Sequence, residues 1–220
     1  MAPEAEHGRP GLHRPPRFRR AAQWLTVFLL SVAGVATSWN GYQAARWGNV
    51  QAERYWRASM LRLESTRAQN TAEQFVEIDV AVFIAWVEAY LQGDTRLTDF
   101  YEERFRDEFE PAFRAWLAQD PLDNHDAAPT PFYLPEYRLA KAQEALDLSE
   151  RAELAFQEGE EANHRSDEYV MSAVMLATVL FFAGISKIFK VHAMQYVLLG
   201  IATALFAVCA WDIATLPKLF

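Results

Sequence analysis

The chain has 220 residues, 51% of them hydrophobic, and 29 Asp and Glu against 21 Lys and Arg give a net charge of −8. Residues 44–168 hold 26 Asp and Glu against 13 Lys and Arg, a net of −13 (13 − 26). Because a phosphate backbone is bound by clustered cations, this charge argues against nucleic acid as a partner. The only cysteine is Cys209, so no disulfide can form within the chain and apolar packing must hold it together.

The first 20 residues contain four prolines and are predicted to form a disordered tail. Three apolar segments follow in the chain, at residues 21–42, 169–189 and 193–214. Each approaches the roughly 20 apolar residues that cross a hydrocarbon core about 30 Å thick. The pattern predicts an all-α integral membrane protein with three transmembrane helices, in contact with membrane lipid.

Basic residues beside the apolar segments predict the orientation, because Lys and Arg near membrane ends are retained on the cytoplasmic side. They lie before the first segment and at the turn where the second segment ends: Arg14, Arg17, Arg19, Arg20, Lys187 and Lys190. We therefore expect a cytoplasmic N-terminus, a cytoplasmic turn at 190–192, an extracytoplasmic domain at 43–168 and a short outer tail at 215–220. High Ala and Arg with low Lys favour a bacterial source, and hence the inner membrane.

An alternative makes the first segment a cleavable signal peptide, since Gly34-Val35-Ala36 has the small residues of a cleavage site. Against this, the apolar run continues through Trp39. Trp39 and Tyr42 lie where an interfacial aromatic belt is expected. We therefore expect a retained transmembrane helix.

The acidic domain is predicted to stand on two long helices. Residues 22–72 contain no proline. Pro135 is well placed as the first residue of a second helix, and the stretch that follows it is residues 136–188. These stretches have 51 and 53 residues, or about 75 to 80 Å each at the helical rise. Their equal lengths predict a long, coiled-coil-like antiparallel helix hairpin.

Between these two helices the chain becomes aromatic. Residues 75–91 predict a buried helix that ends at Gly93-Asp94-Thr95, and residues 97–117 predict a second helix interrupted near Pro111. Residues 120–135 contain four prolines and form a long loop. Long loops of this kind are binding elements or straps over a hydrophobic surface.

Two clusters contain metal-ligand residue types. The first has three- and four-residue helical spacing and comprises Glu160, Glu161, His164, Asp167 and Glu168. A solvated collar paired with Arg165 explains the same residues, and we assign no metal to them. The second cluster, Asp123, His125 and Asp126, is typical of Asx-rich turns.

The sequence contains no nucleophile elbow and no glycine-rich phosphate cradle, so we predict no catalytic residue, no cofactor and no enzyme activity. Within residues 21–39 and 170–186 there is no Lys, Arg, Asp or Glu, unlike the proton and ion pathways of transporters. The polar Asn40 and Asp212 lie toward segment ends. Asp212 is interpreted as an interfacial residue, with a pore-mouth ligand as the alternative.

Three stretches carry a family resemblance: residues 38–47, residues 105–122, and residues 166–169 with 180–186. Across residues 20–217 the chain resembles a family of uncharacterised bacterial membrane proteins. The resemblance implies three crossings with a helical insert, and it implies no activity.

The leading functional hypothesis is a non-enzymatic inner-membrane protein whose extracytoplasmic domain binds a protein partner or mediates homo-oligomeric assembly. One alternative is an oligomeric channel with Asn40 and Asp212 around an outer vestibule that attracts cations. Another alternative is a divalent-cation sensor that uses His164 and its neighbours.

Overall fold

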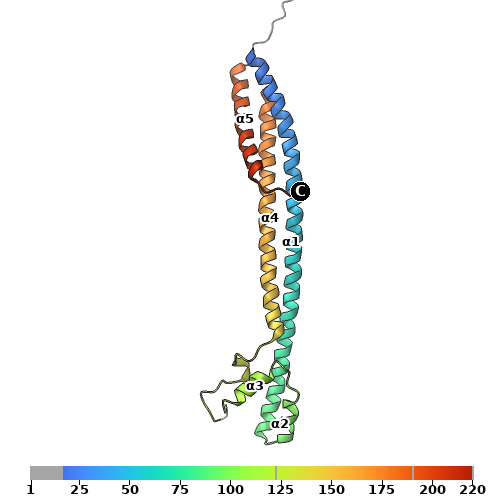
Figure 1. The fold of residues 1–220 in the computed structure, drawn as a ribbon, viewed down its shortest axis with the longest axis vertical. Helices are drawn as coiled ribbons and strands as arrows, with labels where there is room; N and C mark the ends of the chain where they lie inside the picture. The colour runs from blue at the N-terminus through green and yellow to red at the C-terminus, as the bar shows by residue number, and fades with distance from the viewer. Residues whose placement is uncertain (1–16, 122, 190, 220) are drawn as a thin grey trace, which may run out of the picture. The chain divides into compact units, whose positions relative to one another are not determined.

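A computed structural model describes residues 17–121, 123–189 and 191–219. Over these residues the fold is all-helical and contains no strand, which confirms the predicted class. Figure 1 labels the α-helices: α1 (Arg17–Leu91), α2 (Thr95–Glu102), α3 (Glu110–Leu117), α4 (Ala140–Ile185) and α5 (His192–Thr215). The short 3-10 helix η1 (Pro131–Tyr133) lies between α3 and α4 in the chain.

Three helical stretches are long and apolar enough to cross a membrane: Arg20–Leu91, Ala140–Ile185 and Ala193–Thr215. Their length and composition agree with the three predicted crossings. The expected disordered tail is wrong at its end, because α1 already begins at Arg17. Residues 1–16 of that tail lie outside the described residues.

One continuous helix, α1, replaces the two that the sequence predicted between residues 22 and 91. Between Pro16 and Pro111 the chain has no proline, and an internal glycine weakens a helix by only about 1 kcal/mol. The predicted stop is confirmed at Gly93, whose φ of 72° lies in the left-handed region that favours glycine. Asp94 then caps α2 by accepting a hydrogen bond from the Leu97 amide at 3.0 Å.

The predicted aromatic helix at 97–117 is two helices, and its break was misplaced. The chain leaves α2 after Glu102 and re-enters helix at Glu110, so the break covers residues 103–109. Pro111 lies in the first turn of α3. Proline is tolerated there because the first amides of a helix have no intrahelical acceptor.

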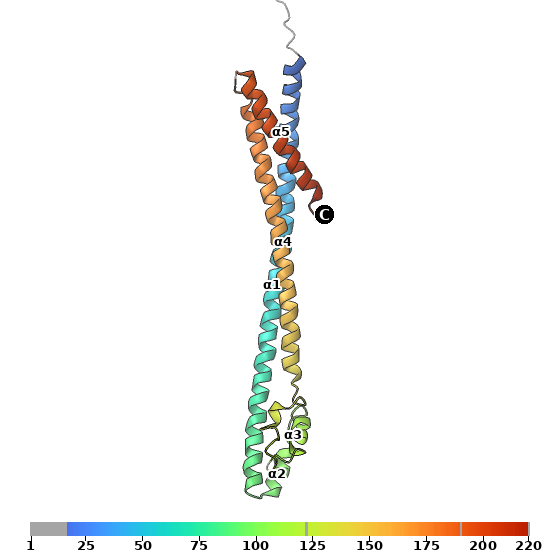
Figure 2. The same cartoon turned by 90° about the vertical axis from the view of Figure 1, so that its left-hand side faces the viewer.

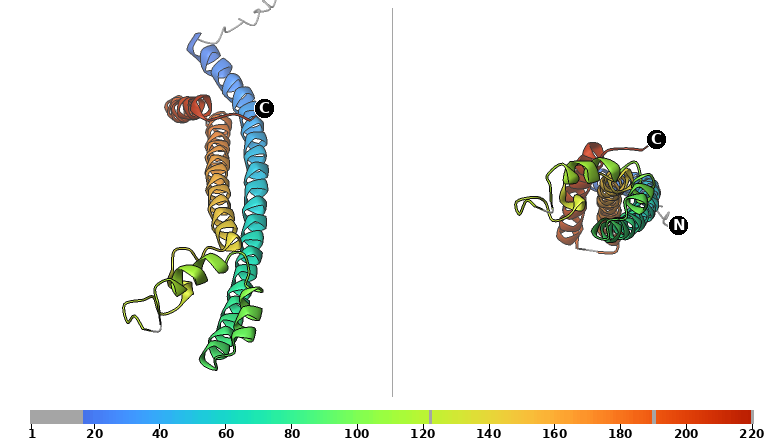
Figure 3. Two further views of the ribbon diagram at one scale, coloured as in Figure 1. Left: turned by 60° about the horizontal axis from the view of Figure 1, so that its bottom comes forward. Right: turned by 90° about the horizontal axis from the view of Figure 1, so that it is seen from below.

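The start predicted for α4 at Pro135 is also wrong, since α4 begins at Ala140. Leu134 is extended, and the Tyr137 amide closes a turn on its carbonyl at 3.0 Å. Leu134 and Tyr137 pack against aromatic side chains, so tertiary packing holds residues 134–139 out of the helix. Figure 3 shows the excursion of the chain between α3 and α4.

The chain divides into a central unit, residues 53–159, and a terminal unit, residues 1–52 with 160–220. In the central unit α1 and α4 run antiparallel, because Arg54 pairs with Glu158 at 2.9 Å while Ser65 donates to the Ala145 carbonyl at 2.7 Å. Their seam consists of small and aliphatic side chains at helical spacing: Ala58, Leu61, Ala68, Ala145, Leu148, Ala152 and Ala155.

The central unit also contains a compact group of aromatic residues, which we call the aromatic cluster. Its buried members are Phe83, Trp86, Phe109, Phe113 and Trp116. Figure 2 shows α2 and α3, which flank the cluster, beside the last turns of α1.

In the terminal unit α1, α4 and α5 pack around a second core. Its buried residues are small or aliphatic: Ala22, Leu29, Ala33, Leu176, Val179, Ala183, Leu199, Ala202 and Cys209. Small side chains let membrane helices approach closely.

The residues after α5, Pro217–Leu219, form a strap across this unit. The Gln43 side chain both donates to the Leu219 carbonyl and accepts from its amide, each at 3.0 Å. The Pro217 carbonyl accepts from Trp47 Nε1 at 3.2 Å and from the Tyr169 hydroxyl at 3.1 Å. The strap therefore connects the end of α5 to both α1 and α4.

Candidate functional site

The aromatic cluster forms where one face of α1 packs against one face of α3. Phe83 and Trp86 lie three residues apart on α1, as do Phe113 and Trp116 on α3, so each pair occupies one helix face. The Trp86 and Phe113 rings meet edge to face at 4.8 Å between centroids, and those of Phe83 and Trp116 at 5.2 Å. Edge-to-face pairs are favourable beyond their buried area.

Both buried indoles have hydrogen-bond partners. Trp86 Nε1 donates to Glu102 Oε1 at 2.9 Å, and Trp116 Nε1 donates to the Ala128 carbonyl at 2.8 Å. The first bond connects α1 to α2, and the second connects α3 to the loop before η1. Buried Trp side chains usually need such a partner, so these bonds fix the orientation of the two indole rings.

A buried carboxylate lies on α1 one turn before the aromatic cluster. Asp79 is 2% exposed and accepts from Arg106 Nη1 at 2.8 Å and from the Tyr137 hydroxyl at 2.9 Å. Burial raises the pKa of Asp79 and outweighs the lowering by Tyr137 and Arg106. The pKa of Tyr137 is raised as well, first by its own burial and then by its hydrogen bond to Asp79.

The same network reaches the start of α4. Arg106 bonds Glu108, and Glu108 Oε1 accepts from the Ala140 amide at 2.9 Å. The Arg106 guanidinium also lies over the Phe75 ring, 3.9 Å from its centroid. This network thus connects three segments of the chain, which are α1, residues 103–109 and the start of α4.

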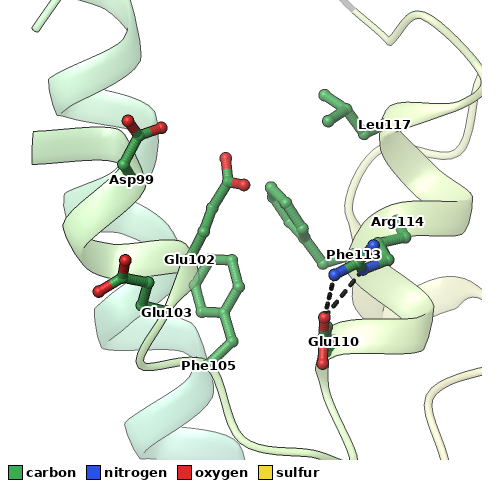
Figure 4. A pocket seen from close by; sticks show the side chains of 8 residues that line it. All are labelled: Asp99, Glu102, Glu103, Phe105, Glu110, Phe113, Arg114 and Leu117. Atoms are coloured by element: carbon green, nitrogen blue, oxygen red, sulfur yellow. Dashed lines mark hydrogen bonds and ion pairs between the residues drawn. The ribbon is translucent and has the colours of Figure 1, made fainter. Parts of the chain in front are cut away.

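A cavity of about 470 Å³ opens between α2 and α3, and we call it the acidic cavity. Figure 4 shows its residues, with Glu102 from α2 and Phe113 from α3 directed toward each other across it. Its lining is Asp99, Glu102, Glu103, Phe105, Glu110, Phe113, Arg114 and Leu117. Arg114, its one cation, is bonded to Glu110 through Nε at 2.9 Å and through Nη2.

A second cavity of about 310 Å³, the apolar cavity, has aromatic and aliphatic walls. Its lining is Phe83, Trp86, Val87, Tyr90, Leu91, Trp116, Leu117, Asp120, Pro121 and Pro129. Asp120, its one carboxylate, has a φ of 52°, in the left-handed region that non-glycine residues rarely adopt. Leu117 lines both cavities, so they adjoin along α3.

The terminal unit has a cavity of its own, of about 310 Å³, lined by α4 and the end of α5. Two carboxylates line it, Glu168 and Asp212, together with Ser172, Met171, Met175, Thr215 and Leu216. Asn40 is fully buried in the same unit, and its side-chain nitrogen and oxygen find no hydrogen-bond partner among the described residues.

The predicted acidic cluster on α4 forms ion pairs along the helix. Arg165 bonds Glu168 at 3.1 Å and lies 3.6 Å from Glu161, while His164 Nε2 is 3.5 Å from Glu168. Glu160, Glu161, His164 and Asp167 are all exposed. Nowhere in the described part of the chain do three His, Cys, Asp or Glu side chains gather closely enough to hold a metal ion.

The loop cluster at Asp123, His125 and Asp126 adopts a turn. The Asp123 and Asn124 amides both donate to the Asp120 carbonyl, and the Asn124 side chain accepts from the Asp126 amide at 3.0 Å. These are the local hydrogen bonds that Asx-rich loops are expected to make.

The sequence interpretation missed the Asp79, Arg106 and Tyr137 network. The available signal was a carboxylate in the most apolar stretch outside the predicted crossings, since a buried charge needs a partner. Sequence spacing could not identify those partners, which lie 27 and 58 residues away along the chain.

The chain was compared with protein-family models, curated proteins and solved structures, and none of them matches it. The resemblance to a bacterial membrane-protein family therefore remains a prediction.

Proposed function

We propose that this is a non-enzymatic, multi-pass protein of the bacterial inner membrane whose surface beside the aromatic cluster, at Leu91 and Leu117, binds a protein partner or a second copy of the chain. In this proposal α1, α4 and α5 cross the bilayer, with the N-terminus in the cytoplasm. Residues 43–168 are extracytoplasmic and are carried on a long antiparallel helix hairpin. The basic residues around the apolar segments support this orientation.

The observation that carries the proposal is an apolar surface around two open cavities. Leu91 and Leu117, which line these cavities, remain exposed at 72% and 42%, next to a core that has buried five aromatic rings. Solvent-facing apolar side chains gathered around cavities are typical of surfaces that bind another molecule. Trp and Tyr, which dominate interface energetics, line the apolar cavity.

The fixed geometry of the cluster also supports binding. The Trp86 and Trp116 hydrogen bonds and the Asp79 network hold its walls in place. A surface that is already ordered loses little conformational entropy when a partner docks, which favours affinity.

Site-specific photo-crosslinking in the membranes of the organism that makes the protein tests the proposal. A photoreactive amino acid at Leu117 is expected to give one discrete protein adduct. At Leu154, which is 60% exposed on α4 away from the cluster, it is expected to give none. An adduct with another protein indicates a partner, and an adduct of two copies indicates assembly. No discrete adduct at Leu117, or the same adduct at both positions, contradicts the proposal.

A cation-conducting oligomer is the second candidate function. It is favoured by the pair of carboxylates, Glu168 and Asp212, in one cavity of the terminal unit, and by the unpaired buried amide of Asn40. Rings of carboxylates attract cations at pore mouths. Planar-bilayer recordings of the purified chain should then show cation currents that Asp212→Asn reduces. An absence of currents would exclude this function.

A further inference from the structure

The two cavities that adjoin at Leu117 define what kind of partner fits there. We propose, on the basis of the function proposed above, that the partner presents a Lys or Arg and a large apolar residue within one short segment. The basic side chain enters the acidic cavity, and the apolar side chain enters the apolar cavity on the other side of Leu117.

Charge supports a basic side chain in the acidic cavity. Four carboxylates and one guanidinium line it, a balance of −3 (1 − 4). Arg114 is already bonded to Glu110, and Arg104 lies 3.6 Å from Glu103, whereas neither Asp99 nor Glu102 forms an ion pair with a described cation. The surrounding unit, residues 53–159, has 11 Lys and Arg against 22 Asp and Glu, a net of −11 (11 − 22). A cation approaching this surface is attracted, and an anion is repelled.

The aromatic wall of the acidic cavity favours the same ligand chemistry. Phe105 and Phe113 line it next to Glu102, so a cation there lies near aromatic rings and a carboxylate together. The central unit already contains two such pairings, the first of them with Glu103, which lines this cavity. Arg104 lies 3.6 Å from the Phe100 ring centroid and 3.6 Å from Glu103. Arg106 combines the Phe75 ring with Asp79 in the same way.

The apolar cavity selects the second residue. Trp86, Trp116 and Tyr90 provide its aromatic walls, and Leu91 is exposed at its border. Buried aromatic pockets of this kind bind the few side chains that carry most of an interface's energy. Since Leu117 borders both cavities, one partner segment can fill them at the same time. This two-part requirement distinguishes a protein segment from a free cation, which would need only the acidic cavity.

The test uses the full chain in its own membranes, with the photoreactive amino acid at Leu117. The charge variant combines Asp99→Asn with Glu102→Gln, which keeps an acceptor for Trp86. Its control, Asp147→Asn with Glu150→Gln, makes the same charge change at exposed positions on α4. We expect adduct yield to fall about tenfold in the charge variant, since charge-assisted hydrogen bonds are lost. We expect the control to leave the yield unchanged.

A second pair of variants tests the apolar cavity. Leu91→Asp places a charge at its border, and Leu146→Asp does the same at an exposed α4 position outside it. Only Leu91→Asp should reduce the adduct. Unchanged thermal melting of both variants would exclude misfolding as the cause, because both leucines are largely exposed.

Mass spectrometry of the adduct identifies the crosslinked segment, which should contain Lys or Arg close to a large apolar residue. A segment without a basic residue, or a yield that does not respond to the charge variant, overturns this inference while the proposed function stands. A non-protein adduct overturns both, and so does the absence of any adduct at Leu117.

Discussion

Gln43 and Leu219 lie 176 residues apart and are joined by a reciprocal pair of hydrogen bonds, each 3.0 Å long. The primary amide of Gln43 both donates to and accepts from the backbone of Leu219, as one strand residue does with another. Gln43 is fully buried, and both bonds are partly buried. Together with the bonds to Pro217, they fix the residues that follow α5.

Removing the two Gln43–Leu219 hydrogen bonds should make α5 pack less stably in the terminal unit. Gln43→Leu deletes both hydrogen bonds, each worth about 1 kcal/mol, and leaves the Leu219 backbone groups without them. Cys209 is fully buried on α5 and is the only cysteine, so its alkylation rate in detergent reports on α5 directly. We expect alkylation to accelerate about tenfold, and the exposed Gln74→Leu control to match the unmodified chain. Equal rates for all three proteins would show that the strap does not secure α5.

The aromatic cluster should unfold readily when its centre is emptied. Phe83→Ala removes a ring that contacts five others, and buried Phe→Ala changes cost about 3 to 5 kcal/mol. Phe100→Ala removes a half-exposed ring and should cost less than about 1 kcal/mol. Urea titration followed by tryptophan fluorescence measures both. Similar losses for the two variants would mean that Phe83 does not centre the cluster.

The stability of the central unit should depend on pH through Asp79. Its pKa is raised by burial, so above pH 3.8 the folded state retains a proton that the unfolded chain has released. Where the folded state binds more protons, stability falls as pH rises. The contribution of Asp79 is thus fully present below its unfolded pKa and declines until pH exceeds the folded pKa.

The matched comparison is Asp79→Asn, which does not titrate. We expect the unfolding free energy of the unmodified chain, minus that of the variant, to fall as pH is raised from about 3 to about 8. Urea titrations at each pH measure this difference. A difference that grows with pH would mean that Arg106 and Tyr137 outweigh burial and hold the pKa of Asp79 low.

Alanine should have opposite effects at two helical glycines. A Cβ at Gly159 would lie 2.5 Å from Cδ1 of Tyr55, whereas one at Gly41 would meet nothing within 4 Å. Gly→Ala within a helix gains about 1 kcal/mol from propensity. Gly41→Ala should therefore raise the melting temperature. Gly159→Ala should lower it, because the Tyr55 ring must shift from its stack on Phe156. A higher melting temperature for Gly159→Ala would mean that this ring moves at little cost.

The sequence was sufficient for features that depend on local pattern. The three membrane-length helices follow from the length of apolar runs, and the stop after α1 follows from the backbone freedom of Gly93. It was insufficient where distant contacts decide. Pro135 predicted the start of α4, but Leu134 and Tyr137 pack against the aromatic cluster and α4 begins at Ala140.

The candidate site was harder to predict than the fold. The exposed clusters around His164 and His125 could be considered as metal sites because their residues are neighbours in sequence. In the structure their contacts are local ion pairs and turns. The cavities at Leu117 bring together residues from α1, α2, α3 and the following loop. No spacing rule connects those segments before the aromatic cluster has formed.

The bond between Glu108 and the Ala140 amide bears on the order of folding. The first amide of α4 donates to a side chain 32 residues earlier in the chain, so a contact with the 103–109 segment helps to set where this helix begins. Helix nucleation is costly, and in an isolated peptide of residues 131–160 local preference alone would select the starting residue. In that peptide the helix is expected to start at Pro135, which is favoured as a first helical residue. A start at Ala140 would therefore indicate that the rest of the central unit has already folded.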